Sequence, residues 1–141
     1  MILGLGTDII EISRIRSMID RHGDHFLDRC FTPNEIEYAR RYRDPSVRFA
    51  GRWAAKEAVV KVLGTGFVRG VTFHDIAIFP HDSGRPGVRL TGGAAGIAEN
   101  LGISDILLTI SHSHEYATAT AIGIGTPPDG SATLRDRPAA D

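Results

Sequence analysis

The first twelve residues mix Ile, Leu and Gly in a pattern that predicts a buried strand. Because alternate side chains of a strand point to the same face, one face should carry Ile2, Gly4, Gly6, Asp8 and Ile10. The two glycines would let a neighbouring element approach the strand closely. Asp8 would then be the one charged group on a surface otherwise suited to burial, which requires an explanation.

Helical patterns follow as far as residue 63. The isoleucines of residues 12–21 recur at helical spacing and predict an amphipathic helix, with basic side chains mostly off its apolar stripe: Arg14, Arg16 and Arg21. Thr32, Pro33 and Glu35 match the pattern of a helix cap, so a second helix should begin at Pro33. After a break in the chain, a longer helix over residues 47–63 should end at the glycine that follows it.

The second half of the chain predicts a hairpin, a helix and two further strands. Apolar positions on either side of the turn residues 82–84 predict the hairpin, over about residues 71–90. The helix should cover residues 92–101, and the strands residues 106–111 and 116–124. Residues 126–141 hold three prolines and few apolar side chains, so we expect one domain over residues 1–125 and a disordered tail over residues 126–141.

The composition fits one ordinary globular domain, since 42% of the 141 residues are apolar and 23% are charged. Sixteen basic and seventeen acidic side chains leave a net charge of -1, so no global field marks the chain as a binder of nucleic acid or of membranes. A single cysteine, Cys30, cannot build an internal disulfide framework. With no secretory leader pattern and no run of eighteen apolar residues, we expect a cytoplasmic protein.

The long predicted helix carries ionisable groups on one face. At about 100° per residue, Trp53, Glu57 and Lys61 share that face with several alanines, whereas Arg52 projects elsewhere. Glu57 and Lys61 could form an exposed salt bridge one turn apart, which is the usual case for such a pair. Trp53 and the alanines indicate instead that the face is packed, and Asp8 offers a second carboxylate without a local partner.

Two converging carboxylates would suit a magnesium ion. Magnesium is small and octahedral and keeps several of its waters, so it commonly binds one or two protein carboxylates together with phosphate oxygens. A nearby lysine would neutralise further phosphate charge. If Asp8 and Glu57 meet in the fold, the sequence predicts a magnesium-diphosphate site beside Lys61.

The motifs that contain these residues resemble those of the holo-acyl-carrier-protein synthases, small members of the 4'-phosphopantetheinyl transferases. The similarity extends from Met1 to about Ile124 and leaves out the tail. Its most specific feature is the joint occurrence of a Gly-Thr-Asp string and a Trp-Ala-Ala-Lys-Glu-Ala string in so short a chain. The matching segments are residues 4–9, 31–33 with Glu35, 49–58, 63–66, 75–76 and 110–113.

The resemblance implies an α+β fold in which a small antiparallel sheet packs with a long helix, the 4'-phosphopantetheinyl transferase fold. It also implies a homotrimer whose active sites are shared between neighbouring subunits. The expected reaction is attack by a serine of an apo-acyl carrier protein on the phosphorus of coenzyme A that bears the pantetheine arm. Adenosine 3',5'-bisphosphate would be the leaving group.

The same resemblance assigns roles to individual residues. Asp8 and Glu57 would hold the magnesium ion and Lys61 would contact the diphosphate, so these three are the expected catalytic residues. Arg52 and His112 are assigned to the phosphates of coenzyme A or to the arrangement of the site. The general base stays open between a metal-bound water and Glu57.

Two surface features have ordinary alternatives. A histidine between two serines, such as His112, is commonly a surface or hydrogen-bonded residue, and His114 lacks the third ligand that a zinc site would need. From residue 14 to residue 61 there are eleven basic and seven acidic side chains, and a solvated face is the usual explanation. Because carrier proteins are acidic, the resemblance instead predicts a carrier-protein contact at three arginines: Arg14, Arg16 and Arg21.

Two other classes of function are compatible with parts of this pattern. A catalytically silent relative would bind coenzyme A or a carrier protein without transferring anything, but the chain keeps Asp8, Glu57 and Lys61. A magnesium-dependent nuclease or phosphatase would need more acidic ligands and a broader basic surface than the sequence offers. The transferase is therefore the favoured hypothesis. Whether the carrier serves fatty-acid or polyketide synthesis is left open by the sequence.

Overall fold

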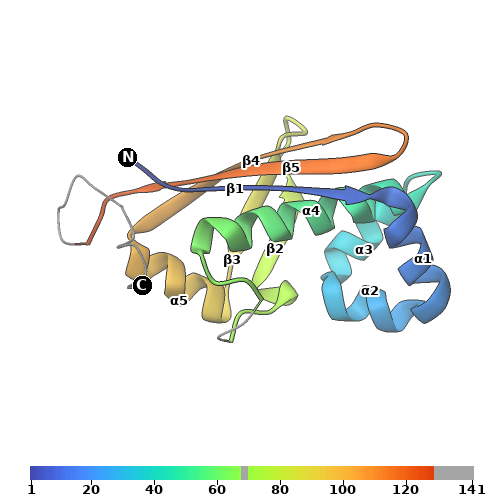
Figure 1. Cartoon of the computed structure of the whole chain (residues 1–141), viewed down its shortest axis with the longest axis horizontal. Coiled ribbons are helices and arrows are strands. Elements are labelled where there is room, and N and C mark those ends of the chain that lie inside the picture. The colour runs from blue at the N-terminus through green and yellow to red at the C-terminus, as the bar shows by residue number, and fades with distance from the viewer. Residues whose placement is uncertain (68–69, 129–141) are drawn as a thin grey trace, which may run out of the picture.

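The computed structural model describes residues 1–67 and 70–128 (Figure 1). The predicted tail beyond residue 128 lies outside the described residues. The helices are α1 (Ile12–His22), α2 (Asp24–Cys30), α3 (Pro33–Arg40), α4 (Pro45–Leu63), the 3₁₀ turn η1 (Phe73–Asp75) and α5 (Gly92–Leu101). The strands are β1 (Ile2–Glu11), β2 (Ile76–Pro80), β3 (Pro86–Leu90), β4 (Ile103–His112) and β5 (Tyr116–Gly125).

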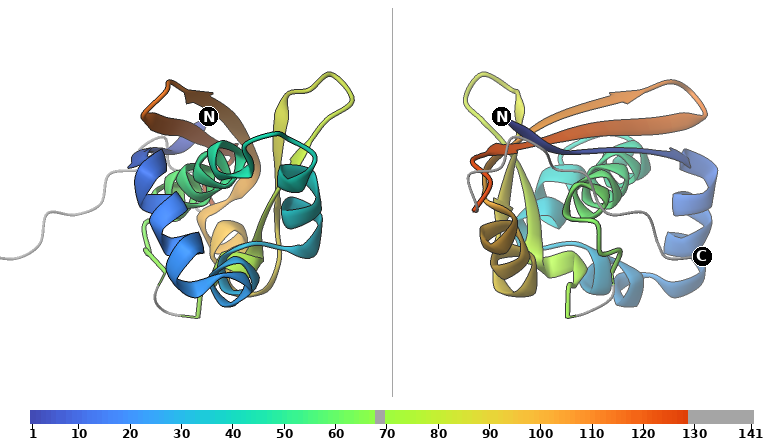
Figure 2. Two further views of the ribbon diagram at one scale, coloured as in Figure 1. Left: turned by 90° about the vertical axis from the view of Figure 1, so that its right-hand side faces the viewer. Right: turned by 60° about the vertical axis from the view of Figure 1, so that its left-hand side comes forward.

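The strands form two antiparallel sheets. β1, β5 and β4 make a three-stranded sheet in that order, and β2 pairs with β3 in a separate hairpin. α4 runs along one face of the larger sheet, mainly over β1 and β5 (Figure 1). The views in Figure 2 show α1, α2 and α3 grouped at one end of α4, with α5 near the other end. The predicted α+β fold, a small antiparallel sheet packed with a long helix, is confirmed.

Helix α4 is the centre of the core, and its ends follow the capping rules. Asp44 accepts a hydrogen bond from Ser46 N at 3.2 Å, and Pro45 occupies the first turn, so the helix begins two residues before the predicted start. Gly64 ends the helix with φ 75°, a left-handed conformation that glycine adopts without steric cost. Twelve of the nineteen residues of α4 are buried, which makes it the scaffold for the rest of the fold.

The short helix α2 was not predicted from the sequence. It begins after Gly23, whose positive φ of 53° ends α1 and turns the chain. Phe26, Leu27 and Cys30 are buried on one side of it, at helical spacing. By contrast, α3 begins at Pro33 as predicted, with the complete capping box at its start.

Strand β1 packs closely on α4 because its inner face carries glycines. A Cβ added to Gly6 would lie 1.9 Å from the carbonyl oxygen of Ala58, and one added to Gly4 would lie 2.7 Å from that of Val62. The predicted close approach is confirmed. The inner face also buries Ile10, whereas Ile2 at the start of the strand is 64% exposed, contrary to its predicted burial.

None of the helices formed by residues 1–67 and 70–128 could cross a membrane, since none combines sufficient length with sufficient apolar character. α4 has nineteen residues but includes Arg48, Arg52, Lys56, Glu57 and Lys61.

Candidate active site

Lys61 on α4 reaches across to β1. Its ammonium nitrogen Nζ donates a hydrogen bond to the carbonyl oxygen of Thr7 at 2.7 Å and lies 3.3 Å from Oδ1 of Asp8. The Lys61 side chain is 52% exposed and the Asp8 side chain 17%, so the contact lies at the solvent-accessible edge of the packing between β1 and α4. Fifty-three residues separate the two in sequence, and the close packing of β1 on α4 brings them together.

Glu57 lies one helical turn before Lys61 and is half-buried. Burial is the main cause that raises the pKa of its carboxyl group, and the negative charge of Asp8 raises it further. The positive charge of Lys61 acts in the opposite direction and is the weakest of the three influences. The negative charge of Asp8 therefore acts on the Glu57 carboxyl group.

The alternative of a Glu57–Lys61 salt bridge is not realised. Within residues 1–67 and 70–128, the only ion pair of Lys61 within 4.0 Å is with Asp8, and Glu57 has none. Asp8 and Glu57 together carry more negative charge than the one ammonium of Lys61 balances. This local excess would favour a further cation.

The donor set of the site fits magnesium better than zinc. Among the described residues, no three His, Cys, Asp or Glu side chains gather closely enough to hold a metal. Magnesium needs only one or two protein carboxylates, because substrate phosphates and waters complete its octahedron. Asp8 and Glu57 would supply these two carboxylates, whereas structural or catalytic zinc takes three or four protein ligands.

Arg52 lies elsewhere. Nine residues separate it from Lys61, so at about 100° per residue the two side chains leave α4 in opposite directions. The guanidinium carbon of Arg52 lies 4.0 Å from the ring centre of Tyr38 on α3, and the side chain is buried. Its Nε has no hydrogen-bond partner in the described part of the chain. Within one chain, the structure does not bring Arg52 to Asp8.

His112 is exposed at the end of β4. It lines a cavity of about 400 Å³ together with residues of α1, α4 and the β4–β5 turn, including Arg16 and Asp44. Arg16 and Asp44 form an ion pair of 2.9 Å across this cavity. The strand register places Ile110 level with Asp8, two strands away, so His112 lies on the order of 10 Å from the carboxylate pair. Arg14 and Arg21 are exposed on α1.

A second pair of charged residues, Glu35 and Lys56, was not recognised as a pair in the sequence. Lys56 Nζ lies 2.7 Å from Glu35 Oε1 and donates to the Phe73 carbonyl oxygen at 2.9 Å. Glu35 Oε2 accepts from Ile78 N at 2.7 Å. Burial lowers the pKa of Lys56, and the charge of Glu35 opposes that shift. The pair joins α3, α4, η1 and β2. In the sequence, a lysine among the alanines and valines of α4 was the feature that could have indicated a buried, paired side chain.

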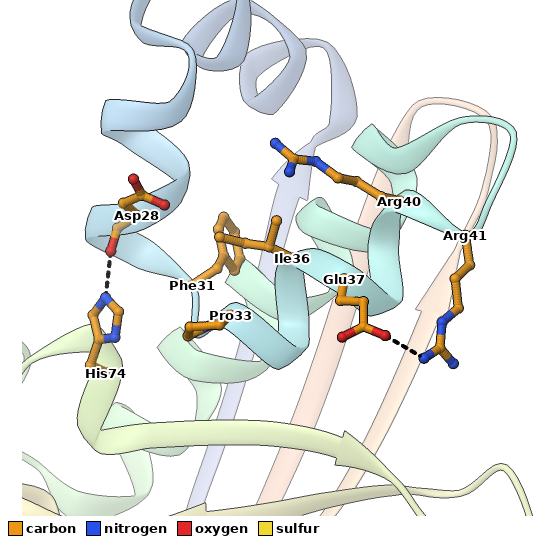
Figure 3. Close-up of a pocket in the computed structure, with 8 residues that line it drawn as sticks. All are labelled: Asp28, Phe31, Pro33, Ile36, Glu37, Arg40, Arg41 and His74. Carbon is orange, nitrogen blue, oxygen red and sulfur yellow. Dashed lines mark hydrogen bonds and ion pairs between the residues drawn. The ribbon is translucent and has the colours of Figure 1, made fainter.

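A cavity lies on the other side of α4, between α2, α3 and η1 (Figure 3). It measures about 740 Å³ and has apolar walls formed by Phe31, Pro33 and Ile36. Figure 3 also shows the ion pair between Arg41 and Glu37 at its rim. None of the site residues predicted from the sequence lines this cavity.

Comparison with known proteins places these observations in a family. The family model described as the 4'-phosphopantetheinyl transferase superfamily matches residues 4–121. A holo-[acyl-carrier-protein] synthase of Koribacter versatilis is 46% identical over 117 residues, which is 83% of this chain and 94% of that protein.

Solved structures show the same similarity. The holo-[acyl-carrier-protein] synthase of Neisseria meningitidis has a TM-score of 0.80 at 33% identity, and the match covers 88% of this chain and 99% of that chain. The Helicobacter pylori enzyme, solved in complex with coenzyme A, has a TM-score of 0.76 at 30% identity, with 85% and 99% covered.

Proposed function

Since the chain belongs to the 4'-phosphopantetheinyl transferase superfamily, among its holo-[acyl-carrier-protein] synthases, we propose that it transfers the 4'-phosphopantetheine arm of coenzyme A to a serine of an apo-acyl carrier protein. The proposed reaction depends on magnesium and releases adenosine 3',5'-bisphosphate. The observation that carries the proposal is the juxtaposition of Asp8, Glu57 and Lys61 between β1 and α4. Each of the three lies in a segment that the family model covers.

In the proposed mechanism the protein positions the substrates and neutralises charge. Asp8 and Glu57 would hold the magnesium ion, which stabilises negative charge on the diphosphate. Lys61 would contact the diphosphate, since its ammonium is half-exposed and is held at the site by the Thr7 carbonyl. Glu57, with its raised pKa, is a candidate to accept the proton of the carrier serine when it is not engaged with the metal.

We assign Arg52 and His112 to the phosphates of coenzyme A, contacted across a subunit boundary. Within one chain both side chains are away from Asp8, and a site shared between neighbouring subunits would explain that separation. The homotrimer is proposed from the family resemblance. The apolar outer face of the large sheet supports a contact between subunits, since Leu5 is 67% exposed there.

The carrier protein would dock on α1. Arg14 and Arg21 are exposed on this helix and have no ion pair in the described part of the chain, whereas Arg16 is paired with Asp44. An acidic partner would be attracted to this surface by charge complementarity.

The test is a transfer reaction read on the carrier itself. The purified protein is incubated with coenzyme A, magnesium and an apo-acyl carrier protein, and the carrier is weighed by mass spectrometry. We expect the carrier to gain the mass of one phosphopantetheine arm, and we expect a chelator or the Asp8→Asn variant to abolish the gain. A nuclease, a phosphatase or a silent binding module would leave the mass of the carrier unchanged.

A further inference from the structure

Lys61 makes two contacts of unequal length at the site. The shorter, 2.7 Å, ties its ammonium to the Thr7 carbonyl oxygen of β1, and the longer, 3.3 Å, joins it to Asp8 Oδ1. The Thr7 bond holds the ammonium in place whether or not Asp8 is available. In the metal-free protein Lys61 therefore serves as the counter-ion of Asp8.

A counter-ion in this position opposes a divalent ion at the same carboxylate. Charges a few ångströms apart interact appreciably near a protein surface, because the effective dielectric constant there is well below that of water. The hydrogen bond to the Thr7 carbonyl keeps the ammonium beside Asp8 when no other anion is near. Glu57 has no such competitor among the described residues, so the obstacle lies on Asp8.

We infer that Lys61 competes with magnesium for Asp8 and makes metal binding by the protein alone weak, and that the diphosphate of coenzyme A relieves this competition. The inference rests on the proposed function, because it takes Asp8 as a metal ligand. The diphosphate would draw the ammonium away from Asp8, while the bond from Lys61 to the Thr7 carbonyl can persist. Metal and coenzyme A then bind with positive coupling, and by linkage each raises the affinity of the protein for the other by the same factor.

Binding of Mn²⁺ tests the inference without any turnover. Manganese accepts the same oxygen ligands as magnesium, and the electron paramagnetic resonance signal of the unbound ion reports its concentration. We expect Lys61→Met to bind Mn²⁺ at least about fivefold more tightly than the unsubstituted protein when coenzyme A is absent. Coenzyme A should then tighten Mn²⁺ binding less in this variant than in the unsubstituted protein.

Two matched variants isolate the cause. Lys61→Arg keeps the charge at the site and should bind Mn²⁺ about as weakly as the unsubstituted protein does. Arg29→Met removes an exposed positive charge from α2, remote from Asp8, and should likewise leave Mn²⁺ affinity unchanged. Tighter binding in Arg29→Met as well as in Lys61→Met would show a general electrostatic effect and overturn the specific role of Lys61.

The outcomes also separate this inference from the proposed function. Equal or weaker Mn²⁺ binding by Lys61→Met overturns the inference, because Lys61 would then support the ion instead of opposing it. If Asp8→Asn abolishes Mn²⁺ binding in the same experiment, the metal site of the proposed function still holds. If Asp8→Asn binds Mn²⁺ as the unsubstituted protein does, Asp8 is not a ligand, and the metal site and the inference fail together.

Discussion

Glu35 and Lys56 form an ion pair of 2.7 Å in which the side chains are 1% and 0% exposed. The pair lies on the opposite side of α4 from the sheet and joins four segments of the chain. Lys56 directly precedes Glu57, so the pair fixes the part of α4 that presents the candidate metal ligand.

Removal of one partner of this pair should be strongly destabilising. Lys56→Met leaves the Glu35 carboxylate buried without its cation, and we expect the free energy of unfolding to fall by about 3–5 kcal/mol. Urea denaturation measures this change. The control is Arg41→Met, which breaks an ion pair with Glu37 in which both side chains are 68% exposed, and it should cost about 0–1 kcal/mol. Equal losses in the two variants would contradict the structural role of the buried pair.

The contact of Gly6 with α4 predicts a second sensitive position. Gly6→Ala would place a methyl group 1.9 Å from the Ala58 carbonyl oxygen, so strand and helix must separate. We expect destabilisation of about 1–3 kcal/mol, and we expect a lower rate constant for phosphopantetheine transfer because Asp8 moves relative to Lys61. Thermal denaturation and the transfer reaction measure the two effects.

Gly96→Ala is the matched control for Gly6→Ala. A Cβ at Gly96, on the exposed side of α5, has no neighbour within 4 Å among the described residues. Alanine is favoured over glycine inside a helix, so this variant should be more stable by about 0.5–1 kcal/mol. Unchanged stability and transfer rate in Gly6→Ala would show that β1 and α4 do not need this close approach.

The raised pKa of Glu57 makes stability depend on pH in a defined direction. The native state keeps the proton of Glu57 to higher pH than the unfolded chain does. The stabilisation from this retained proton is fully present below the ordinary pKa of a glutamate, about 4.3, and it is lost as the pH rises through the raised pKa of Glu57. Burial and the nearby Asp8 cause the penalty on the charged form.

Glu57→Gln should therefore be more stable than the unsubstituted protein at pH 7 when a chelator is present, and the two should converge at about pH 4. Urea denaturation over this pH range gives the comparison. Glu99→Gln removes an exposed carboxylate from α5 and serves as the control for net charge. A Glu57→Gln variant that is less stable at pH 7 would mean that the carboxylate is stabilised, not penalised, by its surroundings.

The sequence predicted most of the elements because local signals were strong. The capping box at Thr32 and the left-handed glycine at the end of α4 are local features, and both were located correctly. The start of α4 was placed two residues late because Pro45 can either break a chain or begin a helix. α2 was missed because its buried residues span less than two turns, too few for a clear periodicity.

Periodicity could predict which residues of the site share one face of a helix or strand, but not which elements meet in the fold. The spacing of α4 placed Glu57 and Lys61 on one face, and the glycines of β1 indicated a close approach of another element. The sequence did not show that Asp8 faces α4, and the contact between Lys61 and Asp8 was not predicted. The buried partner of Lys56 did not follow, since Glu35 comes from a different helix. Likewise, the sequence could not show that Arg52 packs against Tyr38, because that contact depends on how α3 crosses α4.

Charge reversal on α1 tests the predicted carrier surface. Arg14→Glu should raise the apparent KM for the carrier protein and leave the KM for coenzyme A nearly unchanged. The effect should shrink at high ionic strength, because exposed charges are screened. Arg89→Glu, an equal change of charge on β3, is the control and should alter neither constant. An unaltered carrier KM in Arg14→Glu would remove α1 from the docking surface.

The outer face of the large sheet should be a subunit interface. Leu5, Ile122 and Leu107 are aligned across β1, β5 and β4, and Leu5 and Leu107 are 67% and 44% exposed. If a homotrimer covers this row, sedimentation of the unsubstituted protein should give three times the chain mass of 15.3 kDa. Leu5→Asp should sediment as the monomer, because the charged side chain cannot be buried in the interface without a partner. Tyr42→Ser alters an exposed side chain in the connection between α3 and α4 and should leave the assembly intact. A monomeric unsubstituted protein, or a trimeric Leu5→Asp variant, would show that this face is not the interface.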